Sequence, residues 1–270
     1  MGNSHLYDLF NISLEAGKEI MDVYAQDFNV EFKKDDSPLT QADRRAHALI
    51  MRRLNELDCT IPVLSEEGRQ IPYSERRTWT RFWLVDPVDG TKEFIKKNGE
   101  FTVNIAFIEG NYPTIGIIYA PALDVIYFGR NGDAAYKLEH ASKAAVPNEE
   151  ELIRKSIKLP NLKEHSAIRV VASRSHMSQE TEAFIKDLEA KHGGIEVVSS
   201  GSSLKFCLVA EGKADYYPRY APTMEWDTGA GQAIVEAAGG TVTRYEDDER
   251  FDYNRADLLN GWFLVKGSSA

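Results

Sequence analysis

The chain is poor in the features that mark exported, membrane-spanning or disulfide-stabilised proteins. It has only two cysteines, Cys59 and Cys207, which lie far apart and show no metal or disulfide spacing. Such sparse cysteine usage is typical of a reducing compartment, so we expect two free thiols, both packed inside the protein. No stretch approaches the roughly 18 consecutive apolar residues that a membrane-spanning helix needs. No secretory signal is visible either, because charged residues interrupt the first apolar positions early.

Positive charge is also scarce. The formal net charge is −10 at pH 7, which argues against a nucleic-acid-binding surface. A phosphate substrate remains compatible with this charge, because a bound divalent cation can reverse the sign of the field inside a pocket. We expect a soluble, cytoplasmic protein. Peripheral association with the inner membrane is an alternative that no basic amphipathic segment supports.

The first 160 residues predict an α+β domain. Apolar residues at helical spacing indicate an amphipathic helix over residues 6–24 and a second helix that begins at a capping-box-like pair, Thr40 and Asp43. Five short apolar or alternating runs, with turns between them, are typical of an antiparallel sheet, one face of which the two helices would cover. These runs are residues 82–85, 102–108, 114–119, 125–128 and 134–137.

The pattern changes after a charged, proline-punctuated stretch at residues 139–162. Strand-like and helix-like segments then alternate, which is typical of an α/β domain. These segments are residues 168–172, 178–191, 195–198, 203–210, 227–238, 241–245 and 262–265. The sequence therefore predicts an N-terminal α+β domain over residues 1–160 and a C-terminal α/β domain over residues 161–270.

The most informative motif follows a short apolar run and reads Asp86-Pro87-Val88-Asp89-Gly90-Thr91. Its two carboxylates offer the oxygen ligands that Mg²⁺ prefers, and the backbone at Val88 can turn a carbonyl toward the same point. If Gly90 and Thr91 open a helix, their N–H groups face an anion. The alternative is an ordinary turn, which is the usual meaning of an Asp-Gly step after a strand.

Three more acidic residues stand in similar places. Glu66 follows an apolar run, Asp43 lies in the first turn of the second predicted helix, and Asp227 opens the last long one. Singly, each has an ordinary explanation, as a solvated loop carboxylate or as a helix cap. Together with the two motif aspartates, however, Glu66 and Asp227 fall where apolar elements end, which is where α/β proteins place their chemistry. Carboxylates gathered in one pocket repel one another unless cations hold them, so the cluster predicts Mg²⁺ and more than one ion.

The chain resembles the inositol monophosphatase superfamily of Mg²⁺-dependent, lithium-sensitive phosphatases. Its signature motifs are matched by W-L-V-D-P-V-D-G-T-K-E-F from residue 83, S-E-E from residue 65 and E-W-D-T-G-A-G-Q from residue 225. Residues 92–104 and 172–176 are similar to the bacterial 3'(2'),5'-bisphosphate nucleotidase branch. The similarity covers nearly the whole chain in matching order. It implies a layered αβαβα sandwich, which combines the α+β and α/β halves.

The resemblance implies a complete metal centre. Its ligands would be the carboxylates of Glu66, Asp86, Asp89 and Asp227 and the backbone carbonyl of Val88. Asp86 would bridge two Mg²⁺ ions, and Glu66 would hold the first ion and help to place a third through water. Lithium would be inhibitory.

The resemblance also implies catalytic and substrate-binding roles. The N–H groups of Gly90 and Thr91 would hold the scissile phosphate. The Thr91 hydroxyl would pair with Asp43, and this pair, with Glu66, would help to activate a water that attacks in line without a phosphoenzyme.

A second phosphate position would lie in the C-terminal half. By the resemblance, Ser202, Lys205 and Arg219 would hold the non-reacting phosphate, and His176 would lie near the nucleoside. From the residues alone, segment 201–205 is equally well explained as a Gly-Ser turn with a solvated lysine. For His176, the alternative is a surface residue.

The implied reaction removes the 3'-phosphate of adenosine 3',5'-bisphosphate, giving AMP and phosphate, in the service of sulfur metabolism. The sulfated 3'-phosphoadenylyl nucleotide would be a second substrate. The expected partner is this small nucleotide, and a homodimer is left open. One alternative is an inositol or sugar monophosphate phosphatase, which should lack the second phosphate position. Another is a non-catalytic homologue, which should have lost a metal ligand or the Thr-Asp pair, although all these positions are intact here.

Overall fold

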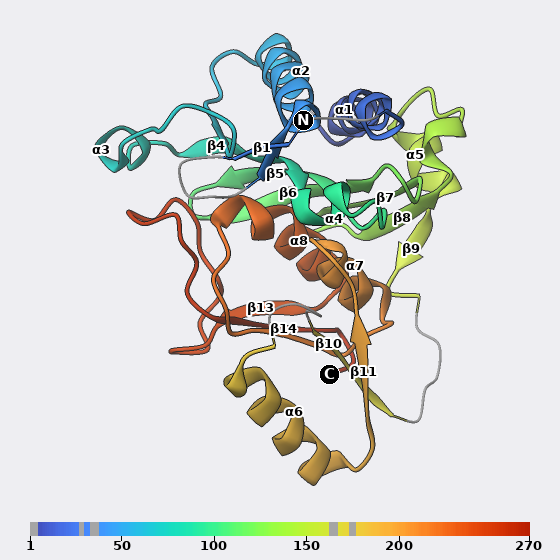
Figure 1. Cartoon of the computed structure of the whole chain (residues 1–270), viewed down its shortest axis with the longest axis vertical. Helices are drawn as coiled ribbons and strands as arrows, with labels where there is room; N and C mark the ends of the chain where they lie inside the picture. Colours follow the sequence, from blue (N-terminus) through green and yellow to red (C-terminus); the bar gives the residue numbers. More distant parts are fainter. Residues whose placement is uncertain (1–4, 27–29, 33–37, 162–166, 173–176) are drawn as a thin grey trace.

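Two β-sheets and three layers of helices alternate through the molecule (Figure 1). The computed structural model describes residues 5–26, 30–32, 38–161, 167–172 and 177–270. The order of layers is α1 and α2, a seven-stranded sheet, α7 and α8, a five-stranded sheet, and α6. The predicted αβαβα sandwich is therefore confirmed.

The seven-stranded sheet has the order β3-β4-β5-β6-β7-β8-β9, and all neighbours are antiparallel except β3 and β4. Its strands are Val63–Ser65, Arg81–Asp89, Thr102–Glu109, Tyr112–Ala120, Val125–Arg130, Ala135–Glu139 and Ile157–Leu159. The outer face is covered by α1 (Leu6–Tyr24) and α2 (Gln41–Leu57) through their buried apolar stripes. The predicted meander and its two covering helices are thus confirmed, although β4 continues past Val85.

A bulge in β4 shapes the end of that strand. Asp86 lies opposite Asn104 and Asp89 lies opposite Thr102, so β4 uses one more residue than β5 across this step. The extra residue falls at Pro87-Val88, where proline has no N–H for the ladder. The bulge turns the two aspartates toward the same end of the sheet.

The five-stranded sheet has the order β11-β10-β12-β14-β13. Its members, in chain order from β10, are Ile168–Ala172, Ile195–Ser199, Tyr216–Arg219, Thr241–Arg244 and Phe263–Lys266. The helix α6 (Gln179–His192) covers its outer face, whereas α7 (Leu204–Glu211) and α8 (Glu225–Ala237) lie between the two sheets. A Cβ at Gly116 of β6 would lie 2.3 Å from the carbonyl oxygen of Ala230, so glycine there lets α8 pack directly on the first sheet.

Smaller elements complete the described part of the chain. They are the paired strands β1 (Val30–Phe32) and β2 (Pro38–Thr40), the helices α3 (Tyr73–Arg76), α4 (Thr91–Ile95) and α5 (Glu149–Lys155), and a 3₁₀ turn at Ala141–Lys143. Within the described residues, no helix is long and apolar enough to cross a membrane.

Two expectations are corrected and one stays a prediction. Cys207 is buried as expected, but Cys59 is exposed, because it lies in the turn between α2 and β3. The last long helix begins at Glu225 rather than at Asp227. The first sheet ends at Leu159 and the second begins with Ile168, but the division into domains 1–160 and 161–270 remains a prediction.

Candidate active site

Three aspartates from two elements meet at one end of the first sheet. Asp86 and Asp89 come from the bulged end of β4, and Asp227 comes from the first turn of α8. One carboxylate oxygen from each lies within 4.8 Å of the others. Burial, followed by the charges of neighbouring carboxylates, raises the pKa of Asp86 and that of Asp227 well above their usual range. Without a cation, burial and mutual repulsion therefore disfavour the charged forms of these two carboxyls.

Glu66 completes this acidic cluster. Its backbone N–H donates to the carbonyl of Val85 at 3.1 Å, which continues the pairing of β3 with β4. Its carboxyl is hydrogen-bonded to Asp86. Among the neighbouring charges, that of Glu66 contributes most to the raised pKa of Asp86. The cluster contains only oxygen donors, and the repulsion among them is relieved by a bound cation. These residues therefore fit a hard divalent ion such as Mg²⁺.

The backbone after the cluster turns sharply. The N–H of Val88 donates to Asp86 Oδ1 at 3.0 Å, and the Val88 carbonyl accepts from the Thr91 hydroxyl at 3.3 Å. Gly90 has a φ of 91°, and a Cβ there would lie 3.1 Å from the carbonyl oxygen of Glu100. This left-handed residue precedes α4, so Thr91 opens a short helix as expected.

Asp43 serves two partners at once. Its Oδ2 accepts from the N–H (2.8 Å) and the hydroxyl (2.6 Å) of Thr40, which is the predicted capping arrangement. Its Oδ1 accepts from the Thr91 hydroxyl at 3.3 Å. Burial raises the pKa of this carboxyl. The Asp43–Thr91 contact is thus present alongside the cap, and its catalytic role stays a prediction.

A cavity of about 340 Å³ opens beside the cluster, between the loop after β4 and the segment that leads into α7. It joins Asp89 and Asp227 to the expected substrate residues Gly90, Ser202, Lys205 and Arg219. Lys205 is buried, and its Nζ donates to the carbonyl oxygens of Ser202 (2.6 Å) and Ser200 (3.3 Å). Burial lowers the pKa of Lys205 to about 8. Arg219 donates to the carbonyl of Pro222 at 2.9 Å, while its buried Nε has no partner among the described residues.

A network of polar side chains behind the cluster was not predicted from the sequence. The Ser203 hydroxyl lies 2.6 Å from Asp89 Oδ2 and 3.0 Å from the Asp227 carbonyl oxygen. Asn104 donates to Ser203 Oγ at 2.7 Å and in turn accepts from Thr102 at 2.9 Å. The available signal was a polar Asn104 inside an otherwise apolar strand. His176 lies outside the described residues.

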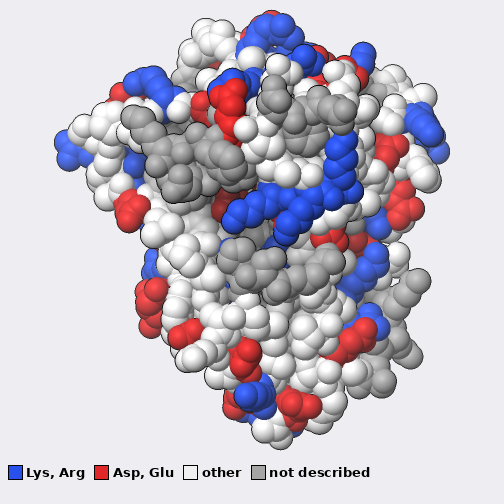
Figure 2. All heavy atoms as spheres, in the orientation of Figure 1, with Lys and Arg blue, Asp and Glu red and all other residues white. Residues whose placement is uncertain are grey.

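Positive side chains gather near the cavity, although the chain as a whole is acidic. Figure 2 shows a group of Lys and Arg side chains on the face where Figure 1 places α4. This helix carries Lys92, Lys96 is its C-cap, and Lys97 follows directly. Lys96 also lines the cavity. Glu93 and Glu100 line the same cavity, so its lining carries both signs of charge.

The layered fold and the acidic cluster define a class of phosphatases, and comparison with known proteins agrees. The profile of the Inositol monophosphatase family matches residues 4–264, so the chain belongs to this family.

The chain is also similar to individual members. It is 44% identical over 263 residues to "3'(2'),5'-bisphosphate nucleotidase CysQ" of Salmonella typhimurium, a match that covers 96% of this chain and 98% of the relative. The crystal structure of CysQ from Bacteroides thetaiotaomicron is 48% identical, with a TM-score of 0.90, over 99% of this chain and 98% of that one. An IMPase of Thermotoga maritima shares the fold at 21% identity, with a TM-score of 0.71 over 96% and 91% of the two chains.

Proposed function

We propose that the protein is a Mg²⁺-dependent phosphatase that removes the 3'-phosphate of adenosine 3',5'-bisphosphate and releases AMP and phosphate. The observation that carries this proposal is a single cavity with two poles for anions. One pole is the acidic cluster, which suits a phosphate through bound cations. The other is the pair Lys205 and Arg219, which suits a phosphate directly. The similarity to a 3'(2'),5'-bisphosphate nucleotidase supports the same substrate class.

The metal centre in this proposal uses Glu66, Asp86, Asp89, Asp227 and the carbonyl of Val88 to hold two or three Mg²⁺ ions. When bound, the ions would lower the pKa of a water molecule and offset negative charge on the phosphate oxygens. Inhibition by Li⁺ belongs to the same proposal.

The remaining residues orient the reactants. The N–H groups of Gly90 and Thr91 hold the scissile phosphate. The Thr91 hydroxyl holds the attacking water, and Asp43 Oδ1, its 3.3 Å partner, takes up a proton with help from Glu66. A raised pKa of Asp43 supports this assignment, because it makes the carboxylate a better proton acceptor.

Substrate choice is assigned to the second phosphate position. Ser202, Lys205 and Arg219 bind the 5'-phosphate, and His176 lies near the nucleoside. The Arg219 Nε, which has no acceptor within the described part of the chain, supports this assignment, because a buried donor without an acceptor is costly until an anion binds. The sulfated 3'-phosphoadenylyl nucleotide is the second substrate. The role in sulfur metabolism and the cytoplasmic location remain predictions.

The test is phosphate release from adenosine 3',5'-bisphosphate and from inositol 1-phosphate, side by side, with Mg²⁺, with chelator and with added Li⁺. We expect Mg²⁺-dependent, Li⁺-suppressed release from the bisphosphate alone. Preference for the inositol ester would keep the metal centre and reject the second phosphate position. Release from neither substrate would favour a non-catalytic homologue.

A further inference from the structure

A buried carboxylate stands two residues before Asp227. Glu225 is the first residue of α8 and is fully buried. The proposed reaction assigns it no task, and it lies outside the lining of the cavity. Burial of a carboxylate is costly unless hydrogen-bond donors surround it. The donors around Glu225 therefore show which segments it connects.

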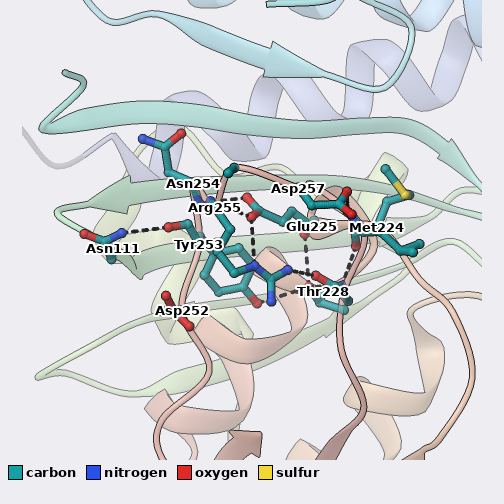
Figure 3. A network of polar contacts seen from close by, with 12 residues as sticks. Asn111, Met224, Glu225, Thr228, Asp252, Tyr253, Asn254, Arg255 and Asp257 are labelled. Atoms are coloured by element: carbon teal, nitrogen blue, oxygen red, sulfur yellow. Dashed lines mark hydrogen bonds and ion pairs between the residues drawn. The ribbon is translucent and has the colours of Figure 1, made fainter. Parts of the chain in front are cut away.

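The hydrogen-bond partners of the Glu225 carboxylate belong to one C-terminal loop, residues 254–260 (Figure 3). Glu225 Oε2 accepts from the N–H of Asn254 at 2.8 Å. Glu225 Oε1 accepts from the N–H (3.0 Å) and the Nε (3.2 Å) of Arg255. The backbone of Glu225 donates to the carbonyl of Leu258 at 3.0 Å, and Asn260 donates to the carbonyl of Met224 at 2.7 Å. The loop is therefore hydrogen-bonded to the N-terminus of α8 at several positions.

The same loop is tied to the N-terminal half of the chain. Arg76, which is buried at the end of α3, donates to Asn254 Oδ1 at 2.9 Å and to the carbonyl of Arg255 at 3.1 Å. Asn254 returns a hydrogen bond to the carbonyl of Arg76 at 2.8 Å. Because α3 lies between β3 and β4 in the chain, this contact connects the loop to the half that supplies Glu66 and Asp86.

The contacts between this loop and α8 can oppose the repulsion among the three aspartates. Three carboxylates with oxygens within 4.8 Å push one another apart when no cation is bound. Asp227 is attached to the first turn of α8, and its own Oδ2 accepts from the N–H of Met224 at 2.8 Å. Anything that fixes this turn also fixes Asp227.

We propose that Glu225 is a positioning residue of the metal centre, which holds the first turn of α8 so that Asp227 stays close to Asp86 and Asp89 before the cation binds. This inference rests on the proposed function. Preorganised ligands bind a cation more tightly, because the cation does not have to draw them together.

The test compares two glutamine variants of buried glutamates in the full-length protein. In E225Q the chain loses the charge that Arg255 contacts, whereas the side-chain shape is kept. E211Q is the matched control, since Glu211 is buried, accepts from the Tyr127 hydroxyl (2.6 Å) and from Lys137 (3.2 Å), and lies at the end of α7. Mg²⁺ binding is measured by titration calorimetry without substrate, and stability by urea unfolding in chelator.

We expect Mg²⁺ to bind E225Q about tenfold more weakly than the wild type, with kcat restored at saturating Mg²⁺. E211Q should lose stability without losing Mg²⁺ affinity. R255A removes the side-chain contact to Glu225 and the hydrogen bond from Arg255 to Asn260, but it leaves both backbone donors to Glu225. It should show a smaller effect in the same direction, and it keeps the test open if E225Q does not fold. Wild-type Mg²⁺ affinity in E225Q, or in R255A if E225Q does not fold, would overturn the inference alone. Absence of Mg²⁺ binding by the wild type would instead overturn the proposed metal centre.

Discussion

Replacing Lys205 with methionine tests the second phosphate position most sharply. The lysine is buried beside Arg219, and its ammonium contacts only backbone carbonyl oxygens among the hydrogen bonds of the described residues. Methionine keeps an unbranched side chain and removes the charge. We expect the variant to lose activity on adenosine 3',5'-bisphosphate and to keep its activity on adenosine 3'-phosphate, which has no 5'-phosphate.

The pKa of Lys205 gives the free-energy cost of its charged form in the ligand-free protein. Burial lowers it from 10.5 to about 8, and this difference corresponds to about 3 kcal/mol against the charged form in the ligand-free protein, at about 1.4 kcal/mol per pH unit. A bound phosphate would offset that cost. Loss of a buried, charge-assisted contact costs about 2 to 4 kcal/mol, so kcat/KM for the bisphosphate should fall by about 30- to 900-fold.

The sign of the pH effect follows from the same pKa. The folded pKa lies below the unfolded one, so the unfolded chain holds this proton more tightly between about pH 8 and pH 10.5. The contribution of Lys205 to stability therefore rises with pH across this window, whereas kcat/KM for the bisphosphate falls above about pH 8. At pH 7 the Lys205→Met variant should be up to about 3 kcal/mol more stable than the wild type without ligand.

The assay measures kcat/KM against pH for both nucleotides, together with urea unfolding. Lys213→Met is the matched control, because the Lys213 side chain is 54% exposed and contacts Glu211 instead of the cavity. Equal losses for the two nucleotides, or a control that behaves like Lys205→Met, would refute the reasoning.

Three further predictions concern the metal centre and the cavity entrance. Asp89→Asn should abolish turnover. It should also stabilise the metal-free protein by about 1 kcal/mol, because it relieves repulsion from Asp86 and Asp227. Unchanged turnover in a steady-state assay would remove Asp89 from the metal centre. Thr91→Val should lower kcat by about 100-fold or more with little change in Mg²⁺ affinity by calorimetry, since it removes the partner of Asp43; a wild-type kcat would contradict its role. Alanine at Lys92 and Lys96 should lower kcat/KM, but not kcat, at low salt, and an effect that persists at about 1 M salt would argue against electrostatic attraction.

Local patterns predicted the elements that depend on neighbouring residues. Apolar spacing indicated both N-terminal helices, and the T-x-x-D signal at Thr40 and Asp43 is a hydrogen-bonded cap in the structure. The antiparallel meander followed from alternation and turns. The gathering of Asp86, Asp89 and Asp227 was expected because these residues fall where apolar elements end and loops or helices begin.

Contacts between distant segments could not be predicted in this way. Ser203 lies 114 residues after Asp89, and nothing in either segment marks the hydrogen bond that joins them. The partners of the Glu225 carboxylate lie 29 and 30 residues further along the chain, in a loop without periodicity. The β4 bulge has a signal in Pro87, but its consequence depends on the register with β5. Such features are fixed by tertiary packing, which composition and period do not encode.

The most direct test of the central claim follows the oxygen atom of the attacking water. The protein, Mg²⁺ and adenosine 3',5'-bisphosphate are incubated in water enriched in ¹⁸O, and both products are identified by ³¹P NMR. We predict adenosine 5'-phosphate without label and inorganic phosphate that carries one ¹⁸O, because water attacks the phosphorus of the 3'-phosphate. Adenosine 3'-phosphate as the product, or label in the nucleotide, would contradict it.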